Sequence, residues 1–217
     1  MKDLQSKLLK IREPEEAPAH GVWFFNSVMI FVAGGVLGYI SKWLDLLELD
    51  STVGWHRIVE QWNLGVVFSE FPIWILLALA IAVLSASPAR ASLNVFFFLG
   101  AMCLSYHVYT ILHAGFNPLS YMLGWYILAA GSTVMAAVCW YGRGVTIWSV
   151  ILDVLILAVI TRFCFSVGHW YIGFNGAVNA GIYAVSVLLL HRNAKWTSVS
   201  VLGGILVAIL LGPLIPV

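Results

Sequence analysis

The sequence is poor in charge and in recognisable catalytic motifs. Only 10% of its 217 residues are Asp, Glu, Lys or Arg, whereas about a quarter is usual for a soluble domain. The net charge is +1 and the basic residues form no long block, which excludes a nucleic-acid-binding protein with a basic surface. No G-x-S-x-G, H-E-x-x-H or C-x-x-C pattern occurs, so the sequence predicts no catalytic residues of these common classes.

Cysteine is also scarce. Cys103, Cys139 and Cys164 lie far apart inside apolar runs, without a Cys/His pair at zinc spacing. We therefore expect buried free thiols, no metal site and no cofactor. A cleavable signal is not indicated either, because the first apolar run begins near Val22, follows an acidic segment and is too long for a signal-peptide core.

Apolar residues are abundant instead. They make up 61% of the chain, and the mean hydropathy of +0.94 is too high for an ordinary soluble domain. We predict an all-α membrane protein with a cytoplasmic amphipathic tail and linker at 1–21 and one transmembrane domain at 22–217. Crossing about 30 Å of hydrocarbon takes about 20 helical residues. The predicted spans, about seven with six as the alternative, are 22–47, 71–88, 92–114, 120–141, 146–167, 174–191 and 196–217.

The basic residues predict the orientation. With the N-terminus in the cytoplasm, the basic tail, Arg90, Arg143, and Arg192 with Lys195 all fall inside, and the opposite connections carry only Arg57. We therefore expect an N-in, C-out protein of a bacterial cell membrane. The tail itself, residues 1–12, is predicted to be a short helix on the membrane surface, with a frayed polar tail as the alternative.

The long connection at 48–70 contains a helical pattern. Trp55, Ile58, Val59 and Trp62 recur at the spacing of one helix face, with polar residues on the other faces. This predicts an amphipathic helix at about 51–64 that lies in the outer interface, its tryptophans at headgroup depth. A lid over a cavity is the alternative.

Asp153 is the strongest single candidate for a functional residue. It is the only acid deep in an apolar run, and an ionised carboxylate there costs about 2.5 to 3.5 kcal/mol on insertion scales. It must be protonated, paired, or exposed to a wet cavity. Lys42 and Asp45 are charges one turn apart near the outer end of the first span, where they can pair with each other, bind a ligand or extend to the interface.

Further polar side chains follow helix faces toward the outer side. His107 in the third span, Tyr121 and Trp125 in the fourth, and Asn179 and Tyr183 in the sixth suit the wall of a small-molecule cavity. Helix–helix packing is the alternative for each. For the GxxxG pair Gly34 and Gly38 in the first span, close packing against a neighbouring helix is the prediction itself. The predicted ligand-binding residues are Asp153, His107, Asn179, Tyr183, Trp125, Tyr121, Lys42 and Asp45.

Three segments carry a resemblance to known proteins: GYISKWLD at 38–45, SPARASLN at 87–94 and SYHVYTILHAGFNP at 105–118. Around them the chain is similar to short polytopic bacterial membrane proteins to which no activity is assigned. Its small-residue-rich first helix, aromatic content and outward polar stripes also resemble the S components of energy-coupling-factor vitamin transporters. That resemblance implies capture of a small solute from outside and a separate motor complex as partner.

Two other classes stay open. An accessory or immunity-type subunit would direct its polar stripes to other helices. An intramembrane metal-dependent hydrolase is suggested by Ser105-Tyr106-His107, which resembles ceramidase-type and progestin-receptor-type proteins, but those need a histidine pair on a final span that here has none. The expected partners are the lipid bilayer, a small-molecule ligand, and a membrane subunit or a second copy of the chain, with no nucleic acid.

Overall fold

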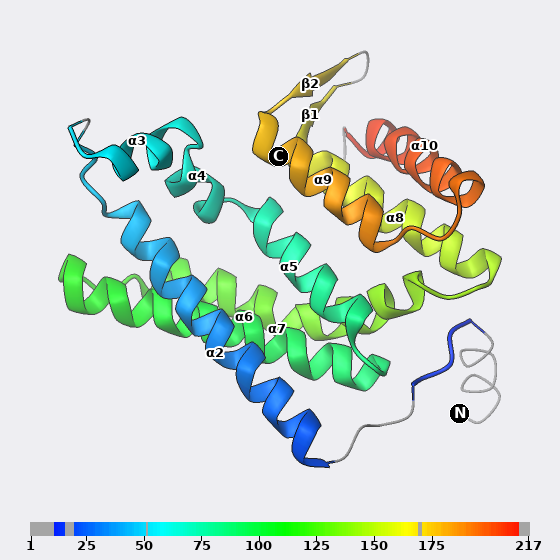
Figure 1. Cartoon of the computed structure of the whole chain (residues 1–217), viewed down its shortest axis with the longest axis horizontal. Helices are drawn as coiled ribbons and strands as arrows, with labels where there is room; N and C mark the ends of the chain where they lie inside the picture. The colour runs from blue at the N-terminus through cyan, green and yellow to red at the C-terminus, as the bar shows by residue number, and fades with distance from the viewer. Residues whose placement is uncertain (1–10, 16–19, 51, 169–170, 213–217) are drawn as a thin grey trace.

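The computed structural model describes residues 11–15, 20–50, 52–168 and 171–212, and it is predominantly helical (Figure 1). The elements run in the order α2 His20–Asp45, α3 Gly54–Gln61, α4 Leu64–Ser69, α5 Phe71–Leu84, α6 Pro88–Tyr109, the π-helix η1 Thr110–Ala114, α7 Leu119–Gly142, α8 Ile147–Cys164, β1 Phe165–Val167, β2 Ile172–Phe174, α9 Ala177–Leu189 and α10 Ala194–Leu211. Most of the tail predicted at 1–12 lies outside the described residues.

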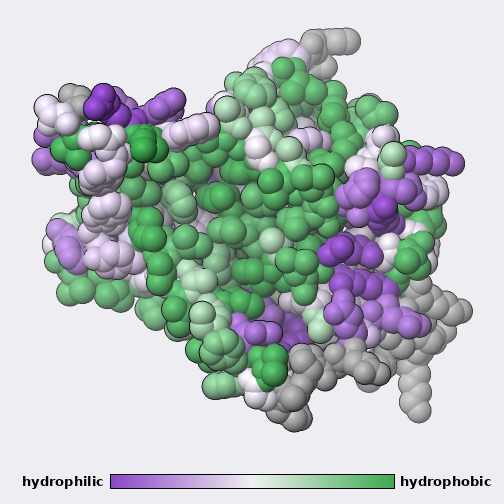
Figure 2. All heavy atoms as spheres, viewed as in Figure 1, coloured by the Kyte–Doolittle hydropathy of each residue, from purple (hydrophilic) through white to green (hydrophobic). Residues whose placement is uncertain are grey.

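In the described part of the chain, five helices are long and apolar enough to cross a membrane: α2, α6 continued by η1, α7, α8 and α10. The chain therefore has the character of a multi-pass membrane protein. Two further apolar helices are shorter, α5 with 14 residues and α9 with 13, and at 1.5 Å per residue each is only about 20 Å long. Figure 2 shows hydrophobic residues between two separate groups of hydrophilic ones on the face in view.

Close approach of α2 and α6 depends on two glycines. A Cβ atom at Gly34 would overlap the carbonyl of Phe98, and one at Gly38 would overlap the carbonyl of Met102. The packing role predicted for this GxxxG pair is therefore confirmed. Nearer the start of both helices, Ser27 donates a hydrogen bond to Asn94, 2.9 Å between Oγ and Oδ1.

Helix α5 lies between two groups of helices. On one side it packs against α6 and α7, and on the other against α8 and α9, while α10 packs on α8 (Figure 1). A buried cluster joins these helices through Leu79 and Val83 of α5, Leu157 and Ile160 of α8, and Ile182 of α9. Gly204 of α10 lies directly against Leu157, which lets these two backbones approach.

The bundle has two chemically different ends. The hairpin end carries α3, α4 and the antiparallel pair β1–β2, in which Phe165 pairs with Phe174. The strap end carries residues 11–15, here called the strap, and the connections at 85–87, 143–146 and 190–193. Backbone hydrogen bonds tie the strap to two of these turns, from Glu15 N to Ala86 O at 2.9 Å and from Val145 N to Ile11 O at 3.0 Å.

Several predicted boundaries differ from the observed ones. The helix expected at 51–64 is observed as the shorter α3, which is followed by a separate helix, α4. The span expected at 146–167 ends at Cys164 because the chain turns into β1, and the one expected from 174 begins at Ala177, after Gly176 with φ 131°. The described part of the last span ends at Leu211.

Candidate functional site

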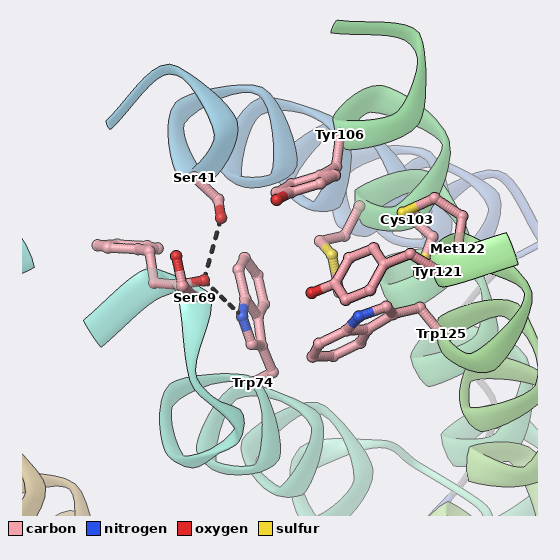
Figure 3. A pocket seen from close by; sticks show the side chains of 10 residues that line it. Ser41, Ser69, Trp74, Cys103, Tyr106, Tyr121, Met122 and Trp125 are labelled. Carbon is pink, nitrogen blue, oxygen red and sulfur yellow. Dashed lines mark hydrogen bonds between the residues drawn. The ribbon is translucent and has the colours of Figure 1, made fainter. Parts of the chain in front are cut away.

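An aromatic pocket lies at the hairpin end. Its wall contains Trp74 of α5, Tyr106 of α6, and Tyr121 and Trp125 of α7, and Figure 3 shows these rings around one hollow. The remaining lining residues come from α2, α4, α6 and α7. They are Ser41, Phe68, Ser69, Met102, Cys103 and Met122. The cavity volume is about 20 Å³, which is enough for about one water molecule.

Two side chains of neighbouring helices hold α4 at this pocket by hydrogen bonds to one of its backbone carbonyls. Ser41 Oγ and Trp74 Nε1 both donate to the carbonyl oxygen of Phe68, at 3.0 and 2.9 Å (Figure 3). Trp125, which also lines the pocket, stacks on Phe71 with ring centroids 4.8 Å apart. The hydrogen bonds to Phe68 therefore hold the C-terminal part of α4 at the pocket.

Lys42 and Asp45 form an ion pair beside the aromatic pocket. Lys42 Nζ lies 2.6 Å from Asp45 Oδ2, and the Lys42 side chain is only 9% exposed while that of Asp45 is 37% exposed. Tyr106 donates its hydroxyl to the same Asp45 oxygen at 3.4 Å, and its ring lies 5.1 Å from Lys42 Nζ. Of the alternatives open from the sequence, the structure shows pairing between these two residues.

A larger polar cavity lies on the other side of α4. Its volume is about 350 Å³. It is lined by Gln61, Trp62, Asn63, Val66, Val67, Glu70, Asn175, Gly176, Ala177, Val178 and Asn179, so the α3–α5 region faces the first turn of α9 across it. Among the predicted ligand-binding residues, Asn179 lines this cavity.

Two residues of this cavity occupy helix N-cap positions without capping. Asn63 precedes α4 and Glu70 precedes α5, yet neither side chain accepts a hydrogen bond from the helix that follows, although such a bond typically contributes about 1 kcal/mol. Asn63 also has a left-handed backbone, with φ 48°. Both residues line the cavity. Across the cavity, Asn175 is held by Ser166, whose Oγ donates to Asn175 Oδ1 at 2.5 Å.

His107 lies apart from both hollows. Its Nδ1 is 2.9 Å from the Tyr126 hydroxyl and its Nε2 is 2.8 Å from Asn117 Oδ1, so both ring nitrogens have partners. The helix changes to π geometry at Thr110, three residues later, and ends at Gly115 with φ 72°. His107 thus joins the end of α6 to the start of α7.

Asp153 lies toward the strap end, in an ion pair. Arg192, from the turn between α9 and α10, donates to Asp153 Oδ2 at 2.7 Å, and the Asp153 side chain is 3% exposed. The same Arg192 nitrogen donates to the carbonyl of Gly142 at the end of α7. The other carboxylate oxygen, Oδ1, has no hydrogen-bond partner among the described residues, and the same holds for the buried Ser149 Oγ one turn away.

A second arginine, Arg12, joins the strap to the ends of two helices. It was not among the residues predicted from the sequence. Arg12 donates to the carbonyls of Val83 and Trp140, at 3.0 and 2.8 Å, and its guanidinium lies 4.2 Å from the Trp140 ring centroid. These carbonyls belong to the last turns of α5 and α7, where the helix itself supplies no donor. Burial and the nearby Arg143 lower the pKa of Arg12, while Glu15 raises it.

The predicted site residues therefore fall into separate groups. Trp125 and Tyr121 line the aromatic pocket, Lys42 and Asp45 contact its Tyr106, and Asn179 lines the polar cavity. Asp153 lies toward the opposite end, His107 bridges α6 and α7, and Tyr183 packs with Phe165 at 5.2 Å between ring centroids. Sequence reasoning did not select Trp74 or Asn63, because neither stands out from a membrane-interface composition.

Two further observations bear on function. No group of three or more His, Cys, Asp or Glu side chains able to hold a metal occurs within residues 11–15, 20–50, 52–168 and 171–212. Comparison of the chain with protein-family models, curated proteins and solved structures gives no match. The functional argument therefore rests on the geometry, and the resemblances drawn from the sequence stay predictions.

Proposed function

We propose that the chain is an integral protein of a bacterial cell membrane that binds a small solute from the non-cytoplasmic side, at the hairpin end. The observation that carries this proposal is the polar cavity of about 350 Å³. Small-molecule sites usually have about 300 to 1,000 Å³ and combine apolar walls with a few polar groups. The cavity has both, in Trp62, Val66 and Val67 on the one hand and Glu70 and Asn179 on the other.

In this proposal all seven apolar helices cross the membrane, with the N-terminus inside. The distribution of basic residues supports that orientation, because Arg12, Arg143 and Arg192 lie at the strap end, as do Arg90 and Lys195 in the first turns of α6 and α10. The short helices α5 and α9 are compatible with this arrangement, because they are flanked by other protein segments, α4 and the β1–β2 hairpin, at the hairpin end.

Helix α3 then lies in the outer interface. Trp55 and Ile58 of α3 are exposed, as is Trp62 directly after it, and Trp55 stacks on Trp43 of α2 with ring centroids 5.7 Å apart. Exposed tryptophans at the end of a span are typical of headgroup depth. Since Trp62 also lines the polar cavity, this helix forms part of the entrance as well as part of the interface.

The aromatic pocket is a second compartment of the same site. Helix α4 lies between the two hollows and contributes Phe68 and Ser69 to one, Val66 and Val67 to the other. The aromatic pocket has a volume of about 20 Å³, so a solute larger than water fits there only if α4 or another wall helix moves. Binding from the outer side is the proposed activity; transport would also require the strap and Arg192 to open at the opposite end.

Thermal unfolding in detergent tests the proposal. A solute that binds only the folded protein at 100 times its Kd stabilises it by about 2.7 kcal/mol, so a screen of vitamins, amino acids, nucleosides, lipids and divalent metals should find a compound that raises the midpoint. The Asn179→Leu variant should lose that shift, and Asn193→Leu, an amide at the strap end, should keep it. No shift with any compound, together with a membrane subunit that copurifies, would favour the accessory-subunit alternative instead.

A further inference from the structure

The charge of the polar cavity points to the class of solute it binds. Of the described residues that line the cavity, Glu70 alone carries a charge, and the other polar side chains are the amides of Gln61, Asn63, Asn175 and Asn179. Ion pairs in the described structure use Arg12, Lys42 and Arg192 as cations, and none involves Glu70. Glu70 therefore lines the cavity without an ion-pair partner among the described residues.

The aromatic part of the cavity is suited to the same kind of partner. Trp62 lines it from the end of α3 and its side chain is exposed. The face of an indole attracts organic cations more strongly than the face of any other side chain. One carboxylate and one indole, with amides that offer carbonyl oxygens, together form a lining that favours a positive charge with an apolar body.

The first turn of α9 weakens the preference of the cavity for a positively charged solute only in part. Ala177, Val178 and Asn179 line the cavity, and a helix N-terminus carries about half a positive charge, which salt screens. Glu70 carries a full negative charge. Because Glu70 makes no capping bond to α5, its carboxylate oxygens stay available to a ligand.

We infer that the polar cavity binds a small organic cation, such as a quaternary or protonated amine, through Glu70 and the ring of Trp62. This inference rests on the proposed solute-binding function and names the substrate class. A neutral solute of the same shape should bind much more weakly, since it gains neither the ion pair nor the cation–π contact. An anion of that shape should bind weakest, because Glu70 repels it.

Three probes of nearly equal shape separate charge from shape: choline, its neutral isostere 3,3-dimethylbutanol and the anion 3,3-dimethylbutanoate. Calorimetric titration of the full chain in dodecyl maltoside should give a Kd for choline about tenfold lower than that for the neutral probe. Glu70→Gln should weaken choline binding about tenfold, which corresponds to about 1.4 kcal/mol, and leave the neutral probe unchanged. Trp62→Leu should weaken choline binding about threefold.

Glu60→Gln is the matched control. Glu60 is an exposed acid of α3 that does not line the cavity, so its neutralisation should leave choline binding unchanged. Higher salt should weaken choline binding in the parent protein, because an exposed ion pair is screened. Competition by phosphatidylcholine in mixed micelles would identify a lipid headgroup as the source of the cation, whereas choline binding without such competition would identify a free solute.

Other outcomes overturn the inference in distinguishable ways. Equal affinity for choline and dimethylbutanol, or tighter binding of the anion, would leave a solute site but remove its preference for cations. An unchanged choline affinity in Glu70→Gln would also contradict it. If none of the three probes binds and the broad thermal screen finds no ligand, the proposed function fails together with the inference.

Discussion

At the strap end, Arg12 and Arg192 donate to carbonyl oxygens in the last turn of α7, whereas at the hairpin end the side chains of Asn63 and Glu70 make no capping bond to the helices they precede. The strap-end arginines and the hairpin-end residues differ in how far their side chains are buried. The side chains of Arg12 and Arg192 are 13% and 16% exposed, and a charge removed from water must be paired or hydrogen-bonded. Glu70 and Asn63 are exposed, so water can satisfy them until a ligand does.

This contrast assigns different roles to the two ends. The charged residues of the strap end hold distant segments together, since Arg12 links the strap to α5 and α7, and Arg192 links the α9–α10 turn to α7 and α8. The polar residues of the hairpin end surround two hollows. Loss of a strap-end residue should therefore reduce stability, and loss of a hairpin-end residue should change ligand binding at little cost in stability.

Arg192→Met should have the largest effect on stability. It leaves the carboxylate of Asp153, 3% exposed, without its counterion, and breaking a buried pair by removing one partner typically costs about 3 to 5 kcal/mol. The midpoint of thermal unfolding in detergent should fall accordingly. The double variant Asp153→Leu with Arg192→Met should recover most of that loss, because it removes the unpaired charge.

Arg143→Met is the control for that experiment, since Arg143 is an exposed arginine of the neighbouring turn. Its midpoint should stay close to that of the parent. If Arg192→Met is no less stable than Arg143→Met, the Asp153 pair does not stabilise the fold and Asp153 becomes a stronger candidate for a ligand-binding residue, as the sequence predicted.

Arg12→Gln should have an intermediate effect. Hydrogen bonds to a charged group contribute about 1.5 to 3 kcal/mol each, and this change loses the charge, the cation–π contact with Trp140 and at least one of the two carbonyl contacts. The lower midpoint should be accompanied by faster protease cleavage near the strap. Arg12→Lys should keep part of the stability, because an ammonium retains the charge but lacks the planar group that lies over the Trp140 ring.

The sequence predicted the chemistry of the spans better than the partners of their polar residues. Apolar length was enough to predict the five long helices, and small-residue spacing was enough to predict the contact at Gly34 and Gly38. The Lys42–Asp45 pair could be anticipated because the two residues are one turn apart on one helix. Local patterns of this kind are visible in a single sequence.

Long-range pairings were not accessible in the same way. Asp153 and Arg192 are 39 residues apart, and only the packing of α8 against the α9–α10 turn brings them together. The sequence therefore presented Asp153 as an isolated acid and placed it in a cavity. The β1–β2 hairpin and α4 were also missed, because Phe165–Val167 and Leu64–Ser69 are short apolar segments that a span or a loop accommodates equally well.

Glu70→Ala should have the smallest effect on stability and so sharpens the contrast between the ends. At a working N-cap the same kind of change costs about 1 kcal/mol, and Asn193→Ala supplies that reference, because the Asn193 side chain accepts a hydrogen bond from Trp196 N at 3.0 Å at the start of α10. Glu70 makes no such bond, so its replacement should change the free energy of unfolding by less than about 0.5 kcal/mol. Midpoints of the two variants, measured together without added solute, provide the comparison. A loss at Glu70 as large as that at Asn193 would mean that Glu70 caps α5 in solution, and its carboxylate would then not be available to a ligand.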